Sequence, residues 1–185
     1  MPPKIRITKD DILNKAVEIV RREGYASVNA RGLAKEIGCS TQPIFSNYET
    51  MDALNKDIIA RAVSVYDSFV KSTLESGEYP PYKAHGMGYI KFAKDERELF
   101  KLLFMRDRDG RTGEDIPIDG VISLLMQSLG LTKEKAERFH VENWIFVHGI
   151  AVMLASGYLD IDEPLISDMI TDAYHGLKHS FEVEK

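Results

Sequence analysis

Short polar side chains gather between Thr41 and Asn47, beginning three residues after Gly38. If this segment is helical with Ile44 facing inward, the hydroxyl and amide groups face outward. Such groups hydrogen-bond to base edges, and the amide of Gln42 could pair with adenine, which discriminates between bases by ~1–3 kcal/mol. The segment therefore predicts a surface that reads nucleic acid. In the alternative interpretation Gln42 is solvated and contacts only phosphate.

The sequence does not favour an enzyme. We find no nucleophile with a partner base, no phosphate-binding loop and no metal-ligand cluster at a recognisable spacing, so we expect no catalysis and no cofactor. Asp172, His175 and His179 share one face of the last expected helix and could hold a metal, although solvation or contacts with a second copy are alternatives. A single cysteine, Cys39, excludes an internal disulfide.

Helices must position these residues, because apolar residues recur with the helical period and alternating strand patterns are absent. We expect an all-α chain of about nine helices. Glycines and prolines mark their ends, and Thr8, Asn29, Ser40, Thr50 and Thr132 are candidate caps. The expected ranges are 9–23, 30–37, 41–48, 51–75, 82–93, 95–105, 118–129, 133–155 and 163–181.

The second and third expected helices form a helix-turn-helix unit. Ala34 is small enough for a helix crossing, Gly38 permits a sharp turn, and Leu33, Ile37 and Ile44 are spaced to face inward. In such units the second helix enters the major groove of DNA and the first braces it. The sequence thus predicts a three-helix DNA-binding head in residues 1–50, followed by a helical body in residues 51–185.

Charge is distributed unevenly between these parts. The chain carries a net charge of −5, which argues against nucleic acid, but residues 1–50 hold eight basic and six acidic side chains, a balance of +2. The remaining residues balance to −7. A basic head on an acidic body is attracted to DNA in one orientation.

The head resembles the TetR family of bacterial one-component regulators. The resemblance covers about residues 8–58 and is carried by Gly24-Tyr25, Arg31, Ala34, Gly38, Ser40, Phe45, Tyr48 and Leu54. It implies that the residues placed to touch operator DNA are Asn29, Arg31, Ser40, Thr41, Gln42, Pro43, Phe45, Ser46 and Asn47.

Two positions depart from this pattern. Family members often carry tyrosine in place of Phe45 and lysine in place of Met51, and both are typical phosphate contacts. We therefore expect Lys4 and Arg6 to contribute more to phosphate binding. Phe45 could still lie against the sugar-phosphate edge or a thymine methyl, or it could be a core residue of the head.

The long helix expected at 133–155 carries a wide apolar stripe, which is typical of a helix buried on more than one side. The spacing of Trp144, His148 and Gly149 resembles a TetR subgroup named after these three residues. That resemblance implies a homodimer in which the last two long helices form a bundle between subunits. It also implies a ligand cavity among the fourth to eighth helices.

Aromatic and methionine side chains are candidates for the wall of that cavity, with ordinary core packing as the alternative for each. They are Phe69, Met87, Phe92, Phe100, Phe104, Met126, Trp144 and Met153. His148 could donate a polar contact to a ligand, with a hydrogen-bonded core histidine as the alternative. The resemblance to the TetR family thus implies a ligand-responsive repressor that binds a pseudo-palindromic operator as a homodimer. An activator, or a regulator that binds a partner protein, is the alternative. No apolar run reaches membrane-spanning length and the N-terminus lacks a secretory pattern, so we expect a cytoplasmic protein.

Overall fold

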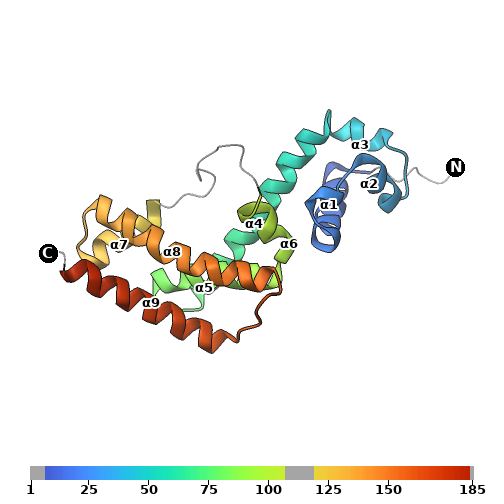
Figure 1. The fold of residues 1–185 in the computed structure, drawn as a ribbon. Helices are drawn as coiled ribbons and strands as arrows, with labels where there is room; N and C mark the ends of the chain where they lie inside the picture. The colour runs from blue at the N-terminus through green and yellow to red at the C-terminus, as the bar shows by residue number, and fades with distance from the viewer. Residues whose placement is uncertain (1–6, 107–118, 184–185) are drawn as a thin grey trace. The chain divides into compact units, whose positions relative to one another are not determined.

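A computed structural model describes residues 7–106 and 119–183, and within these ranges the regular elements are all helical (Figure 1). Lys4 and Arg6 lie outside the described residues. The α-helices of the described chain are α1 (Lys9–Glu23), α2 (Ala30–Ile37), α3 (Gln42–Asn47), α4 (Met51–Glu75), α5 (Pro81–Asp95), α6 (Arg97–Phe104), α7 (Asp119–Leu129), α8 (Lys133–Ala155) and α9 (Glu163–Val183). The expected all-α fold is confirmed.

Side-chain caps begin several of these helices where the sequence predicts them. Thr8 accepts a hydrogen bond from the backbone N–H of Asp11 at 3.1 Å, and the Asp11 carboxylate accepts one from the backbone N–H of Thr8 at 2.9 Å. Asn29 and Thr132 cap α2 and α8 in the same way. Because these caps satisfy N–H groups that have no partner within the helix, they fix the starts of the helices.

The predicted cap at Ser40 is wrong. Thr41 occupies the N-cap position of α3, and its side chain makes no capping hydrogen bond. The reason lies in Pro43, which has no N–H to donate, and in Ile44, whose N–H donates to the backbone oxygen of Thr41 at 3.1 Å. Both donors that a cap would bind are therefore absent or already bonded.

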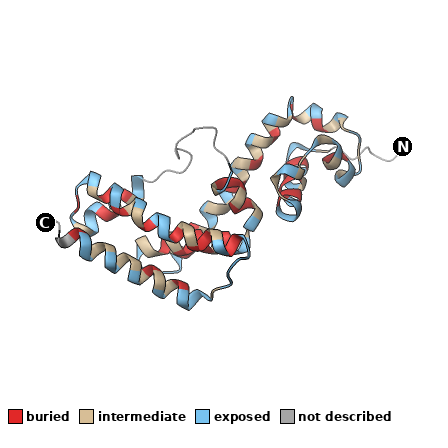
Figure 2. Ribbon diagram, in the orientation of Figure 1, coloured by how far each residue is buried: buried red, intermediate tan, exposed pale blue. Residues whose placement is uncertain are grey.

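The described chain divides into two compact units. Residues 7–67 and 96–106 form the first unit, and residues 68–95 and 119–183 form the second. Helix α4 contributes residues to both, as one continuous helix of 25 residues. The buried residues of α1 and α8 follow one side of each helix, whereas those of α5 are distributed around it (Figure 2).

The core of the first unit is formed by the inward sides of α1 to α4 and by α6. Its fully buried side chains include Ile12, Leu33, Ile44, Ile58 and Phe100. Since α6 packs against α1, a segment from the middle of the sequence belongs to the same core as the N-terminal helices.

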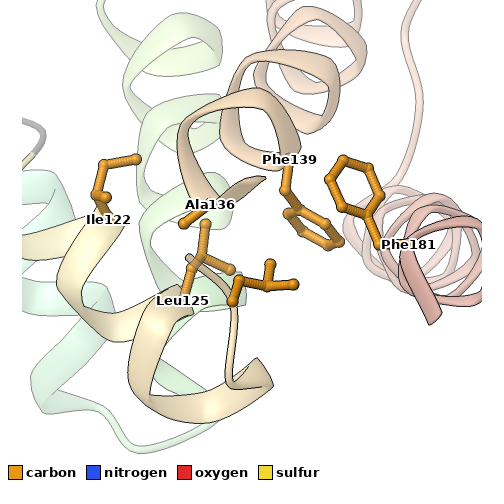
Figure 3. Packing of buried hydrophobic residues seen from close by; sticks show 6 residues of the cluster. Ile122, Leu125, Ala136, Phe139 and Phe181 are labelled. Carbon is orange, nitrogen blue, oxygen red and sulfur yellow. The ribbon is translucent and has the colours of Figure 1, made fainter. Parts of the chain in front are cut away.

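In the second unit α5 and α8 pack together, and α7 and α9 pack against α8. One buried cluster joins α7, α8 and α9 through Leu125, Phe139 and Phe181 (Figure 3). The rings of Phe139 and Phe181 lie 5.3 Å apart in an edge-to-face arrangement, which favours aromatic packing. The cluster therefore anchors the carboxyl-terminal end of α9.

Gly88 sets a close approach between α4 and α5 within the second unit. A Cβ atom at this position would lie 2.8 Å from the Cα atom of Val70. Glycine is therefore required by the packing of the two backbones, not by the local conformation. None of the helices among the described residues combines the length and apolar character needed to cross a bilayer.

Candidate nucleic-acid interface

The turn between α2 and α3 is built around Gly38. This residue has a φ of 78°, a left-handed conformation that glycine adopts without strain. The backbone N–H of Cys39 then donates to the oxygen of Ala34 at 2.9 Å, which closes α2. Leu33, Ala34 and Ile44 are buried, as the helix-turn-helix pattern predicts.

Three polar side chains, those of Tyr48, Asp57 and Lys9, contact one another at the carboxyl-terminal end of α3. The hydroxyl of Tyr48 donates to the Asp57 carboxylate of α4 at 3.1 Å, and Lys9 of α1 forms an ion pair with the same carboxylate at 2.7 Å. The Lys9 ammonium also lies 4.7 Å from the centre of the Tyr48 ring. Hydrogen bonding to Lys9 lowers the pKa of Asp57, while burial, followed by the Asp57 contact, raises the pKa of Tyr48. These contacts connect Tyr48, the residue that directly follows α3, to both α1 and α4.

Three of the predicted DNA-contacting residues use their side chains within the protein. Asn29 accepts from the N–H of Gly32 at 2.9 Å and donates to the oxygen of Ser27 at 3.0 Å. Ser46 donates to the oxygen of Gln42 at 2.9 Å, and Asn47 donates to the oxygen of Pro43 at 2.8 Å. Each of these donors is therefore already engaged with the backbone.

Other predicted residues have no such engagement. Across the described ranges no side-chain hydrogen bond involves Thr41, Gln42 or Arg31, and both Gln42 and Arg31 are exposed. Ser40 is also exposed, and Pro43 is partly buried in the first turn of α3. The start of α3 thus presents a hydroxyl and an amide to solvent, and a guanidinium on α2 accompanies them.

Phe45 is not a core residue of the head. Its side chain is 48% exposed, although its neighbour Ile44 is fully buried. The core interpretation of Phe45 is therefore wrong, because the inward side of α3 is occupied by Ile44 and Tyr48. An exposed aromatic ring beside the polar residues of α3 is available for an apolar contact.

Most cations of α1 are paired with carboxylates. Lys9, Arg21 and Arg22 bind Asp57, Glu96 and Glu36 respectively. By contrast, Arg31 and Lys35 of α2 form no ion pair with any described residue, and both are exposed. The positive charge that remains uncompensated on this side of the unit is therefore adjacent to the turn and α3.

The residues predicted to line a ligand cavity do not come together as one set. Phe100 and Phe104 belong to the first unit, where the Phe104 ring lies 5.5 Å from that of Tyr66. Met87, Phe92 and Phe100 are at most 1% exposed, as core residues are. Met126 is 36% exposed, on the outside of α7.

Trp144 and His148 form a stacked pair on α8. Their rings lie 4.8 Å apart and 17° from parallel, and Nδ1 of His148 lies 2.7 Å from the hydroxyl oxygen of Tyr89. Trp144 is 40% exposed, so the pair lies partly at the surface. Burial lowers the pKa of His148, which favours the neutral imidazole.

The structure also contains a groove of about 380 Å³ in the second unit. Phe69 is the one member of the predicted set that lines it. Its other lining residues were missed by the sequence analysis. Four of them carry hydroxyls: Ser68, Ser72 and Thr73 on α4, and Ser76 directly after that helix. Across residues 7–106 and 119–183 no His, Cys, Asp or Glu side chains gather as metal ligands would, Asp172, His175 and His179 included.

Two comparisons bear on this site. No protein-family model matches the chain. The chain is 21% identical over 175 residues to YobS of Bacillus subtilis (strain 168), whose name describes it as an uncharacterized HTH-type transcriptional regulator. The match covers 91% of this chain and 90% of that protein, so the similarity extends well beyond the helix-turn-helix segment.

Proposed function

We propose that the protein is a DNA-binding transcription regulator of the TetR type, which represses from a pseudo-palindromic operator as a homodimer and responds to a small molecule. The observation that carries the DNA-binding part is the start of α3, where the side chains of Thr41 and Gln42 form no hydrogen bond among the described residues. The similarity to a protein named as an HTH-type transcriptional regulator supports the same function.

In this proposal the contacts divide into two kinds. Thr41 and Gln42 read base edges, with Phe45 against the sugar or a thymine methyl. Arg31 and Lys35 bind phosphates, since they are exposed cations without an acidic partner among the described residues. Asn29, Ser46 and Asn47 act mainly by holding the backbone, because their side chains already bond within the head.

The homodimer is supported by an exposed apolar stripe on α8. Val141 and Ile145 are 50% and 59% exposed, and they lie on the same helical face as Gly149. A Cβ atom at Gly149 would meet no atom within 4 Å, so this face is open in the single chain. Apolar residues gathered on one helix face commonly mark a protein interface, and Leu165 of α9 is exposed as well. A two-fold partner would place two recognition helices on one DNA site.

A ligand would act through its difference in affinity between the DNA-binding form and the other form. A nearly complete switch needs about 5.5 kcal/mol of such difference. We propose that the ligand acts through helix α4, because this one continuous helix supplies residues to both compact units.

The test measures binding of the purified full chain to a labelled duplex from the region upstream of its own coding sequence. We expect saturable binding that weakens steeply as salt rises, because several phosphates are neutralised. A scrambled duplex of equal length serves as the control. Equal affinity for both duplexes, or no binding at low salt, would contradict operator binding and favour a regulator that acts through a partner protein.

A further inference from the structure

The groove of the second unit has one wall made almost entirely of hydroxyl-bearing residues. Ser68, Ser72 and Thr73 lie in the carboxyl-terminal half of α4, and Ser76 directly follows that helix. The rest of the lining comes from the Phe69 ring, from Glu78 in the following loop and from Lys91 on α5. A volume of about 380 Å³ is within the range of small-molecule sites, which begins near ~300 Å³.

The hydroxyls of this wall present mainly acceptors to the groove. Thr73, which is 5% exposed, donates to the backbone oxygen of Phe69 at 2.8 Å. Ser76 donates to the oxygen of Thr73 at 2.8 Å and accepts from the N–H of Glu78 at 3.3 Å. Because these protons are committed to the backbone, the remaining lone pairs can only accept. The Ser72 hydroxyl makes no side-chain hydrogen bond among the described residues and can donate or accept.

Charge in the groove is mixed and locally balanced. Lys91 forms an ion pair with Glu163 at 2.8 Å, and hydrogen bonding to Lys91 lowers the pKa of that carboxyl. The ammonium has three N–H donors, so donors remain after this ion pair. Glu78 adds an exposed carboxylate that can accept hydrogen bonds. The lining therefore carries one charge of each sign, Lys91 and Glu78, and is matched to neither a cationic nor an anionic ligand.

The Phe69 ring supplies an apolar surface of fixed orientation. It lies 5.7 Å from the ring of Phe92 in an edge-to-face arrangement, and Phe92 is fully buried. The close approach of α4 and α5 at Gly88 holds the same two helices together. The aromatic surface is therefore held in place before any ligand binds.

We propose that this groove binds a neutral polyhydroxylated molecule of the size of a monosaccharide or a cyclic polyol. The hydroxyls of such a ligand donate to the serine and threonine oxygens and to Glu78, and they accept from Lys91. Its C–H face packs on Phe69. The site stands independently of DNA binding, and only the further step of naming this ligand as the effector rests on the proposed function.

The test is isothermal titration calorimetry on the full chain without DNA. The probes are D-glucose, D-ribose and myo-inositol, with spermidine and inorganic phosphate as charged controls. We expect at least one neutral probe to bind with a dissociation constant in the millimolar range or below. Ser72→Ala and Thr73→Val should each weaken binding about fivefold, as expected for the loss of one hydrogen bond. Ser64→Ala, on the same helix outside the groove, should leave it unchanged.

Three results would overturn the proposal: no binding by any neutral probe, tighter binding of spermidine or phosphate than of the polyols, or equal affinity in wild type and Ser72→Ala. Because Ser72 is exposed, its variant should fold normally, and circular dichroism checks that Thr73→Val does as well. Binding of a polyol by a chain that has no operator affinity would sink the proposed function and leave this site standing. Operator binding without polyol binding would do the reverse.

Discussion

The guanidinium of Arg21 and the carboxylate of Glu96 form two parallel hydrogen bonds, 2.8 Å from Nε to Oε2 and 2.7 Å from Nη2 to Oε1. They join the last turn of α1 to the residue that precedes α6, 75 positions later in the chain. Hydrogen bonding to Glu96 is the main cause that raises the pKa of Arg21. The pair therefore links the N-terminal helices to a segment from the middle of the sequence inside one compact unit.

Glu96→Gln should lower the free energy of unfolding by about 1 kcal/mol, because the bidentate charged contact is replaced by a neutral one. Urea denaturation followed by circular dichroism measures this change. The control is Glu142→Gln, which removes an exposed pair with Arg138 within α8 and should cost less than about 0.5 kcal/mol. Equal losses in the two variants would show that the contact between α1 and α6 adds nothing beyond an ordinary surface pair.

Gly88→Ala should destabilise the protein by about 1–3 kcal/mol, because the new methyl group would overlap the α4 backbone at Val70. Thermal denaturation measures the change. Gly120→Ala on α7 is the matched control, since a Cβ atom there meets no atom within 4 Å. A neutral or stabilising effect of Gly88→Ala would mean that α4 and α5 can separate freely at this point.

Ile145→Asp should convert a dimer to a monomer, because it places a charge in the middle of the exposed apolar stripe of α8. Size-exclusion chromatography with light scattering determines the mass. Gln127→Asp, which adds the same charge to an exposed position on α7, should leave the mass unchanged. A wild-type chain that is already monomeric at high micromolar concentration would refute this interface.

Gln42→Ala should reduce the preference for the cognate duplex over a scrambled one by about 1–3 kcal/mol, the difference that one bidentate base contact provides. Arg31→Ala should instead weaken binding to both duplexes to a similar extent and make it less sensitive to salt. Fluorescence anisotropy at two salt concentrations separates the two effects. If Gln42→Ala weakened binding to the cognate and the scrambled duplex equally, Gln42 would not be a residue that reads bases.

Stability should fall as the pH drops below the ordinary histidine value of 6.5. Burial lowers the pKa of His85, His140 and His148, so the unfolded chain binds more protons than the folded one in this range. The contribution of these neutral histidines to the free energy of unfolding is complete above pH 6.5, and it is lost as the pH falls toward their lowered pKa values. Urea denaturation at pH 7.5, 6.5 and 5.5 gives the slope of stability against pH, which His148→Gln should reduce.

Local signals made much of the fold predictable. The caps at Thr8, Asn29 and Thr132 are predictable because each side-chain oxygen accepts from an N–H group three residues later, a relation confined to one turn. The same reasoning failed at Ser40, because Pro43 changes which N–H groups need a partner. The outward position of Gln42 followed from helical spacing, and its exposure agrees with that prediction.

Tertiary contacts were not accessible from such signals. Nothing in the sequence near Arg21 indicates that Glu96 completes its hydrogen bonds, and nothing near Ser72 indicates that Lys91 faces the same groove. The residues predicted to line a cavity do not lie together, because aromatic side chains at helical spacing occur in hydrophobic cores as well as in cavity walls. Phe100 is buried in the core of the first unit and Phe92 in the core of the second, whereas Phe69 lines the groove.

The engagement of Ser46 and Asn47 with the α3 backbone has a consequence for redesign of the head. The side chains of Ser46 and Asn47 support α3 through bonds to its backbone, whereas those of Thr41 and Gln42 form no hydrogen bond among the described residues. Substitutions at positions 41 and 42 therefore alter the outward chemistry of the helix at little cost to folding. A combinatorial library restricted to these two positions is a compact starting point for changing which DNA sequence the protein selects, with the scaffold left intact.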